Sequence, residues 1–508
     1  MLRKILSVGG WTLLSRLTGF IRDVVIAAVM GVGVVADAFV VASRIPNHFR
    51  AIFSEGAFNS AFLPTYAGVL EKEGAAPARS FASRISTLML IVQVALLVLA
   101  LVAMPAVVTL LAPGFSDEPQ KFELAVTLTR ITFPYLLFVT LVTILSAILN
   151  AHERFAAAAA APVLLNVSIV AALAVAFLFP NAGHAAAWGV TAAGVLELVL
   201  VWVAARRLGV APRLEAPRFD PAMKRFFKVL GPAVIGSAGV QLAMFADTII
   251  ASFLPTGAVA SLYYADRIYQ LPLGVIGIAA GTVLLPEMSR RIAAGDETGA
   301  HGAQNRAVGL TLALAAPFVV AFLTLPDLIM AALFQRGAFD AAAAARSGAV
   351  LAAYAVGLPA AVLIRSAVAS FYARSDTVTP LVASLTAMAV NVALKIVLTG
   401  PLGVVGLALA TAIGIWVNLG LLVVLAMRRH WMAPGGTLGR IAAAVGVASL
   451  LLAAFAWFAP VPLEAWVARL PAWHSEILLA ILGAAGALIY GGTLLAGLKV
   501  LGVRLSRR

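Results

Sequence analysis

The chain alternates long apolar runs with short polar stretches, and this pattern determines its predicted elements. A membrane-spanning helix needs about 20 apolar residues, at a rise of 1.5 Å per residue. On that criterion the sequence predicts fourteen transmembrane helices. They are expected at about 5–29, 35–66, 84–112, 123–149, 159–179, 185–206, 224–252, 259–288, 305–333, 346–371, 378–399, 403–427, 438–458 and 475–498. The predicted fold class is therefore an all-α polytopic membrane protein.

The composition supports this class and excludes others. Hydrophobic residues make up 62% of the 508 residues, charged residues only 11%, and the mean hydropathy is +1.02. A soluble domain of this size needs a more polar surface. The net charge of +14 would suit a nucleic-acid-binding protein if the basic residues formed one face, but they lie in short loops between apolar runs. The chain has no cysteine, which excludes disulfides and thiolate metal sites.

The basic residues predict the orientation. When successive loops are assigned to alternate sides of the membrane, 24 Lys and Arg residues fall on one side. The other side receives Lys121, Arg336, Arg346 and Arg469. Because cytoplasmic loops carry the excess of Lys and Arg, we expect both termini in the cytoplasm. The first run, at 5–29, contains internal charges and no A-x-A site follows it, so we expect a retained helix and not a signal peptide.

Short motifs recur at an offset of 222 or 223 residues. The pairs are RIPNHF (44–49) with RIYQLP (267–272), FLPTY (62–66) with LLPEM (284–288), and Arg206-Arg207 with Arg428-Arg429. Six predicted spans separate the copies, so both copies have the same orientation and their pseudo-twofold axis follows the membrane normal. We expect an N-lobe at 1–215 with six helices, a C-lobe at 216–430 with six, and a C-terminal helix pair at 431–508.

The first apolar run carries Arg16, Arg22 and Asp23 where a spanning helix is normally apolar. A charge at mid-bilayer costs from about 3 to more than about 10 kcal/mol, so it persists only in a wet or paired interior. Residues seven apart share a helix face. One interpretation is therefore structural ion pairing, of Arg16 with Asp23 and of Asp37 with Arg44.

The other interpretation is a cavity inside the membrane that binds an anion. Embedded arginines exceed the acids available to pair with them, at Arg22, Arg50 and Arg267. The planar guanidinium matches carboxylate and phosphate oxygens. Arg44 and Arg267 also occupy equivalent positions of the repeat, which suggests approach from opposite lobes.

Longer motifs resemble one family. GFIRDVVIA, ADAFVVASRIPNHFRAIFSEGAFNSAFLP, APGF, ITFPY and LYYADRIYQLPLGVIGIAAGTVLLP are similar to segments of the MurJ/MviN family of lipid II flippases, part of the MOP superfamily. The resemblance covers essentially the whole chain. It implies fourteen helices, two lobes around a central cavity, and a C-terminal pair that forms a groove for the lipid tail. It also implies transfer of undecaprenyl-pyrophosphate-linked disaccharide-pentapeptide from the inner to the outer leaflet of the bacterial cytoplasmic membrane, by alternating access, for peptidoglycan synthesis.

The resemblance also implies roles for individual residues. Arg22, Arg50 and Arg267 would contact the pyrophosphate. The supporting cavity charges would be Arg16, Asp23, Asp37, Arg44, Glu55 and Asp266. Gln270 departs from the family pattern, in which many members carry an acid three residues after the YADR arginine. A role of that acid in a gate between the lobes is therefore in doubt for this chain.

A coupling site is less evident from the sequence. Asp247, Asn391 and Thr411 offer oxygen atoms for a cation, as sodium sites of related transporters suggest, but Lys395 follows Asn391 by one helical turn. We expect its ammonium to pair with Asp247 in place of sodium. Membrane potential is the alternative energy source. We expect no cofactor.

Other functions remain alternatives at this stage. A multidrug or ion exporter, or an O-antigen-type flippase of the same superfamily, would share the architecture. An enzyme is disfavoured because the six histidines are dispersed and the loops are too short for a catalytic domain. Lipid II and membrane lipids are the expected partners, with peptidoglycan polymerases as candidates and no nucleic acid.

Overall fold

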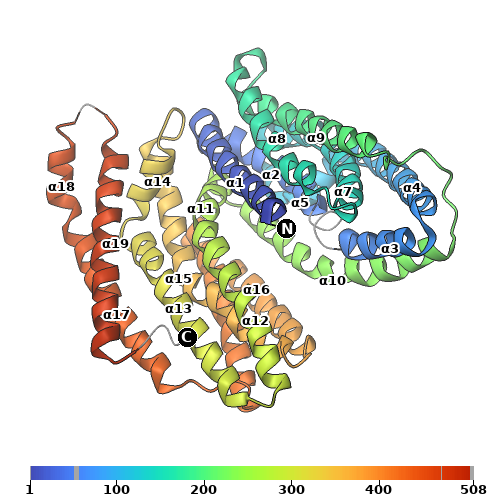
Figure 1. Ribbon diagram of the computed structural model, residues 1–508. Coiled ribbons are helices and arrows are strands. Elements are labelled where there is room, and N and C mark those ends of the chain that lie inside the picture. The colour runs from blue at the N-terminus through green and yellow to red at the C-terminus, as the bar shows by residue number, and fades with distance from the viewer. Residues whose placement is uncertain (1, 51–56, 471, 504–508) are drawn as a thin grey trace. The chain divides into compact units, whose positions relative to one another are not determined.

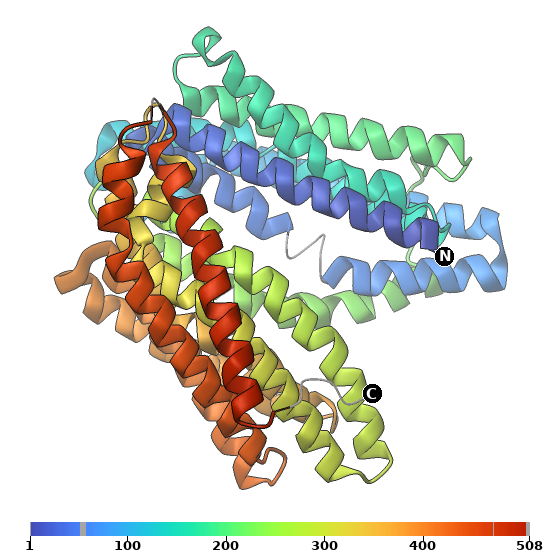
Figure 2. The ribbon, with the colours of Figure 1, turned by 60° about the vertical axis from the view of Figure 1, so that its left-hand side comes forward.

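The computed structural model describes residues 2–50, 57–470 and 472–503, and within these ranges it describes the side chains of all residues except 2–7, 45, 47–50, 57, 235–244 and 277–283. The regular structure of the described residues is helical (Figures 1 and 2). The chain forms two compact units, Met1–Ala260 and Ser261–Arg508, each described by itself. This agrees with the predicted all-α class.

The described residues of the first unit form ten helices and the start of an eleventh. They are α1 (Leu2–Met30), α2 (Val34–Arg50), α3 (Ala57–Glu73), α4 (Ala75–Val102), α5 (Met104–Leu111), α6 (Pro119–Thr132), α7 (Tyr135–Ala151), α8 (Phe155–Ala174), α9 (Ala182–Arg207), α10 (Pro221–Ser252) and α11 (Ala258–Pro272). Short turns lie at Pro113–Asp117 and Ala176–Leu178.

The second unit begins within α11 and continues through a π-helical turn at Leu273–Gly277. Its remaining helices are α12 (Ile278–Ala293), α13 (Glu297–Thr324), α14 (Pro326–Phe334), α15 (Ala341–Tyr372), α16 (Val378–Arg428), α17 (Gly436–Phe458), α18 (Pro460–Val467) and α19 (His474–Val500).

Several helix starts follow from local sequence. Asn181, Asp220, Asp296 and Asp340 each accept a hydrogen bond from the backbone N–H three residues further on. This N-cap geometry satisfies a donor that has no partner within the helix. Short polar residues at the ends of apolar runs therefore determine where α9, α10, α13 and α15 begin.

Glycine permits close packing of α9 against α8 and α7. A β-carbon at Gly189 would lie 3.0 Å from the Cα atom of Ile169, and one at Gly194 would lie 2.9 Å from the Tyr135 ring. Small residues at such contacts let helices approach within a bilayer, where dispersion forces replace the hydrophobic effect between helices.

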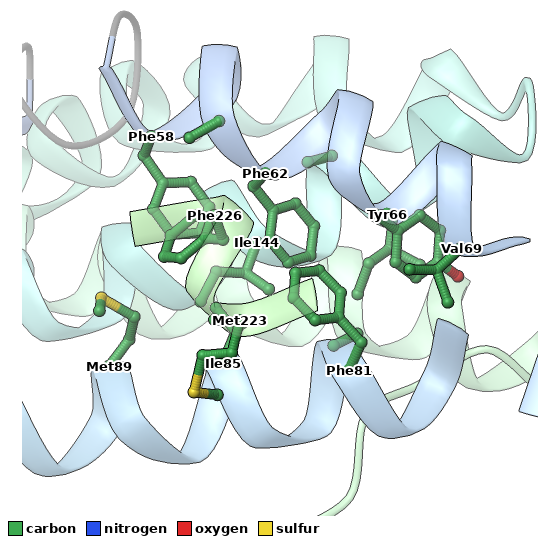
Figure 3. Packing of buried hydrophobic residues seen from close by; sticks show 14 of the residues in the cluster. Phe58, Phe62, Tyr66, Val69, Phe81, Ile85, Met89, Ile144, Met223 and Phe226 are labelled. Carbon is green, nitrogen blue, oxygen red and sulfur yellow. The ribbon is translucent and has the colours of Figure 1, made fainter. Parts of the chain in front are cut away.

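Buried aromatic side chains join α3, α4 and α10 (Figure 3). The Phe62 ring stacks on Phe81 at a centroid distance of 5.7 Å, and the Phe226 ring meets Phe58 edge-on at 5.6 Å. Met223 is fully buried beside them. This packing places α10 in the first compact unit. The predicted lobes at 1–215, 216–430 and 431–508 stay predictions, because they rest on repeat symmetry and not on packing.

Among the described residues, nine helices are long and apolar enough to cross a membrane. They are Ala75–Val102, Pro119–Ala151, Phe155–Ala174, Ala182–Arg207, Glu297–Thr324, Ala341–Tyr372, Val378–Arg428, Gly436–Phe458 and His474–Val500. Val378–Arg428 contains two of the predicted spans, so these nine helices correspond to ten of the fourteen. The predicted spans at 84–112, 159–179 and 305–333 extend beyond the ends of their helices at Val102, Ala174 and Thr324. The other four, at 5–29, 35–66, 224–252 and 259–288, carry internal charges or include residues outside the description.

The longest helix, α16, bends at Gly403, next to the predicted break at residues 400–402. Gly403 adopts φ 54° and ψ −133°, outside the helical region. Beyond the bend the two arms pack on each other, since a β-carbon at Gly414 would lie 2.7 Å from the Asn391 Cβ atom. Gly403 therefore separates two spans that length alone would merge.

Replacing Gly403 with alanine is expected to destabilise the protein by about 1 kcal/mol, because a non-glycine residue is strained at positive φ. No atom lies within 4 Å of the added carbon, so the cost reflects backbone strain alone. Gly400 also has open space around it but lies within the helix, so Gly400→Ala is a matched control expected to be neutral or stabilising. Thermal unfolding in detergent measures both variants. Equal melting temperatures for the Gly403→Ala and Gly400→Ala variants would contradict the strained, non-helical conformation of Gly403.

Candidate functional site

Arg22 links α1 to α8. Its Nε and Nη2 atoms donate to Asp23 Oδ1 at 3.0 and 2.7 Å, and its Nη1 donates to Asn166 Oδ1 at 2.9 Å. Asn166 Nδ2 in turn donates to the Ser15 carbonyl at 3.0 Å and to the Thr18 hydroxyl at 3.1 Å. The Arg22 side chain is 16% exposed. Two neighbours thus hold a largely buried guanidinium in one orientation.

The predicted pairing of Arg16 with Asp23 is wrong. Asp23 pairs with its sequence neighbour Arg22, and Arg16 is exposed. Residues seven apart share a face but are separated by about 10 Å along the axis, whereas a long arginine can fold back onto the adjacent carboxylate. Asp23 therefore orients the arginine that was expected to contact the anion.

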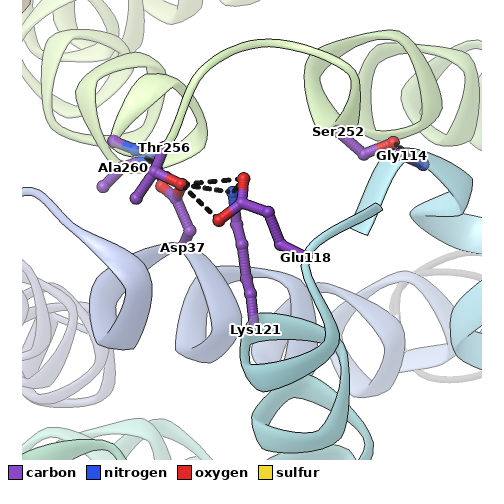
Figure 4. A network of polar contacts seen from close by, with 8 residues as sticks. Asp37, Gly114, Glu118, Lys121, Ser252, Thr256 and Ala260 are labelled. Carbon is purple, nitrogen blue, oxygen red and sulfur yellow. Dashed lines mark hydrogen bonds and ion pairs between the residues drawn. The ribbon is translucent and has the colours of Figure 1, made fainter. Parts of the chain in front are cut away.

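Asp37 on α2 caps the start of α11 (Figure 4). It is fully buried, and its two carboxylate oxygens accept from Gly257 N at 2.7 Å and Ala260 N at 2.8 Å. Lys121 Nζ lies 3.2 Å from Asp37 Oδ2. A buried carboxylate is costly unless paired and hydrogen-bonded, and here both conditions are met. Asp37 thus fixes the entry to the helix that carries Asp266 and Arg267.

Lys121 is the partner that the sequence did not reveal. It was expected in a loop, but it lies in the first turn of α6 with an exposed fraction of 1%. Its ammonium also lies 3.5 Å from Glu118 Oε1, 3.2 Å from the Thr256 hydroxyl and 4.4 Å from the centre of the Phe115 ring. Thr256 donates in turn to the Glu118 carboxylate (Figure 4). The network ties α2, α6 and the segment between α10 and α11 together.

The predicted pairing of Asp37 with Arg44 is also wrong. Arg44 Nη1 donates to the Thr248 hydroxyl on α10 at 2.8 Å. The reason is the same axial separation, together with the commitment of both Asp37 oxygens to α11 and Lys121. Two further predicted residues, the Arg50 side chain and Glu55, lie outside the described residues.

In the second unit, the predicted charges Asp266 and Arg267 lie on α11. Gln270, which departs from the family pattern, donates to Asp266 Oδ2 one turn earlier. The Arg267 guanidinium lies 4.7 Å from the centre of the Tyr263 ring. A cation over an aromatic face is attracted to it, so the Tyr263 ring helps to hold the Arg267 guanidinium in place. The approach of Arg267 and Arg44 from opposite lobes stays a prediction.

Three of the predicted coupling residues lie on α16, and Asp247 lies half-buried on α10 in the first unit. Lys395 is fully buried. Thr411 Oγ1 donates to the Leu407 carbonyl at 3.1 Å, and Asn391 packs against Gly414. Asn391 Oδ1 is buried with no hydrogen-bond partner among the described residues. It is an acceptor that fits an ammonium or a metal cation.

The sequence reasoning missed Asn166 and Lys121. Asn166 is a lone amide within the apolar run of α8, and such a residue is a signal for a functional or packing role in a membrane helix. Lys121 carries no comparable signal, because its buried acidic partner Asp37 is 84 residues away in the sequence and flanking polar residues make its segment resemble a loop.

Residues 26–474 match the family model described as "Lipid II flippase MurJ". The chain is 43% identical over 460 residues to a probable lipid II flippase MurJ of Rhizobium meliloti (strain 1021), covering 89% of this chain and 86% of that one. It is 34% identical over 469 residues to the lipid II flippase MurJ of Burkholderia cenocepacia, covering 90% of both.

Solved structures have the same fold. A structure titled "Lipid II flippase MurJ, inward closed conformation" matches with a TM-score of 0.79 at 24% identity, over 97% of this chain and 99% of that one. An inward-facing multidrug resistance MATE family transporter of the MOP superfamily matches with a TM-score of 0.62 at 17% identity, over 84% and 93% of the two chains.

Proposed function

The chain belongs to the MurJ family of lipid II flippases, and on this premise we propose that it moves the undecaprenyl-pyrophosphate-linked peptidoglycan precursor from the inner to the outer leaflet. Transport would proceed by alternating access, without making or breaking a covalent bond. The observation within this chain that supports the proposal is Arg22, a largely buried guanidinium held by Asp23 and Asn166 inside an apolar helix.

Arg22, Arg50 and Arg267 are proposed to contact the pyrophosphate. A pyrophosphate diester carries about two negative charges, and arginine forks supply aimed N–H donors to its oxygens. Preorganisation by Asp23 and Asn166 lowers the entropic cost of binding, because the guanidinium is already oriented. The supporting residues are Arg16, Asp23, Asp37, Arg44, Glu55 and Asp266.

The architecture proposed for this function has fourteen spans in two six-helix lobes, with the C-terminal pair forming a groove for the polyprenyl tail. The location is the bacterial inner membrane, with both termini in the cytoplasm. The distribution of Lys and Arg supports this orientation. Peptidoglycan polymerases are proposed partners, because they use the lipid that the flippase delivers.

The function is tested by complementation of a strain depleted of its lipid II flippase. The wild-type chain is expected to restore growth and the exposure of lipid II on the outer leaflet. Failure of the wild-type chain, at a membrane level matched to the native flippase, would contradict the proposal. Restored export of a drug or O-antigen in place of lipid II would favour the alternatives from the same superfamily.

The energy source is proposed to be the membrane potential, without a bound sodium ion. Lys395 is fully buried on the same helix as Asn391 and Thr411, one turn after Asn391, and this supports the proposal because its ammonium supplies the charge that sodium would bring. Moving one charge across 100 mV provides about 2.3 kcal/mol.

We therefore expect the same melting temperature in sodium chloride and in choline chloride at equal ionic strength. The choline arm controls for general salt effects. A sodium-dependent rise in melting temperature that Asp247→Ala abolishes would contradict the proposal, because it would reveal an occupied cation site.

A further inference from the structure

A cavity of about 400 Å³ lies within the first unit, away from the charges discussed above. It lies between α4, α7, α9 and the linker that joins α9 to α10. The lining residues are Ser86, Leu90, Leu141, Leu145, Leu198, Val199, Trp202, Pro212, Arg213 and Leu214. Its size is typical of small-ligand sites.

The linker wall of this cavity is fixed by polar residues on α4, and the linker runs past α4 (Figure 1). Arg213 N donates to the Ser83 hydroxyl at 2.9 Å, and Glu215 N donates to the Thr87 hydroxyl at 3.1 Å. Ser80 Oγ donates to Glu215 Oε2 at 2.6 Å. Because these hydrogen bonds hold the linker backbone against α4, the linker wall of the cavity is fixed by the fold.

The cavity is apolar on the side of the helices, and apolar side chains at its rim are exposed. Leucine side chains from α4, α7 and α9 line it, while Val199 and Trp202 at its rim are 50% and 41% exposed. In a membrane protein, exposed apolar side chains on a spanning helix face acyl chains. The cavity therefore suits a hydrocarbon chain.

The cavity is basic at its linker end. Arg213 lines it, and the Arg206 guanidinium lies 5.0 Å from the centre of the Trp202 ring. The nearby acids do not cancel these charges: Glu215 and Asp220 both pair with Arg84, and the three arginines Arg84, Arg206 and Arg213 exceed these two acids by one charge. Basic pockets between helices at the cytoplasmic side bind anionic lipid headgroups.

One polar group in the cavity is unsatisfied. Ser86 lines it, and its buried hydroxyl has no hydrogen-bond partner within the described part of the chain. Buried hydroxyls are almost always hydrogen-bonded. An oxygen-bearing ligand in the cavity would satisfy this group.

We propose that this cavity binds one anionic glycerophospholipid of the inner leaflet. An acyl chain lies along the leucines, and the phosphate lies at Arg206 and Arg213. The Ser86 hydroxyl donates to an ester or phosphate oxygen of the same lipid. The proposal uses the orientation proposed above, and it is independent of lipid II transport.

The test is lipid retention, measured by native mass spectrometry on the full chain released from nanodiscs. The nanodiscs contain phosphatidylglycerol or phosphatidylcholine with identical acyl chains. We expect one retained phosphatidylglycerol and no retained phosphatidylcholine. Arg206→Gln and Arg213→Gln should each weaken retention about fivefold, since one basic residue near the surface contributes about that factor. Equal retention of both lipids would overturn the proposal.

Two further variants distinguish this site from general surface charge. Arg218→Gln removes an exposed arginine on the same linker that does not line the cavity, and it should leave retention unchanged. Val199→Trp fills the rim without altering the buried core or the arginines, and it should abolish retention. A loss with Arg218→Gln equal to that with Arg213→Gln, or full retention with Val199→Trp, would overturn the proposal.

Discussion

Replacing Lys121 with methionine is expected to destabilise the protein by about 3–5 kcal/mol, because it leaves Asp37 charged and buried without its cation. Asp37 is fully buried and Lys121 is 1% exposed, so water cannot compensate for the loss. Methionine is of similar length and apolar, so the variant isolates the charge from the packing. The measurement is unfolding in mild detergent, by temperature or by a denaturant series.

The double variant Lys121→Met with Asp37→Asn should recover much of this loss. Asparagine keeps a capping oxygen for α11 while removing the uncompensated charge. Glu118→Gln is a matched control within the same network, and its effect should be small because the Glu118 side chain is 46% exposed. If Lys121→Met alone unfolds like wild type, the ion pair does not stabilise α11.

Replacing Arg22 with alanine is expected to abolish rescue of a strain depleted of its lipid II flippase. Hydrogen bonds to charged groups contribute about 1.5–3 kcal/mol each, so losing one anion contact predicts transport that is about ten- to a hundredfold slower. Arg22→Lys should also fail, because an ammonium cannot donate as a planar fork to Asp23, Asn166 and a phosphate. Growth and surface exposure of lipid II are the readouts.

Controls separate this effect from misfolding. Arg290→Gln removes one exposed arginine at the end of α12 and should rescue fully. Asn166→Ala keeps the charge of Arg22 but releases its guanidinium, so it should give intermediate transport. Each variant is compared at a matched membrane level and melting temperature. Full rescue by a stable Arg22→Ala variant would return this arginine to a purely structural role.

Local features of the sequence predicted the helices well. The apolar runs correspond to the long helices, and the break predicted at 400–402 adjoins the non-helical Gly403. These features can be predicted from the sequence because a bilayer imposes a length and an apolar composition on each span, independently of its neighbours.

Only the tertiary structure showed which residues pair with the charged side chains of α1 and α2. Sequence spacing paired Arg16 with Asp23, but the structure pairs Asp23 with Arg22 and adds Asn166 from α8. It also replaces Arg44 with Lys121 as the partner of Asp37.

By itself, then, the sequence determined the all-α membrane class, most of the long apolar helices and the family. The tertiary structure decided which side chains meet, and it revealed the cavity between α4, α7, α9 and the linker. The physical reason is that membrane insertion depends on each segment's own composition, whereas a buried charge is stabilised by whichever polar group packing brings within about 3 Å of it.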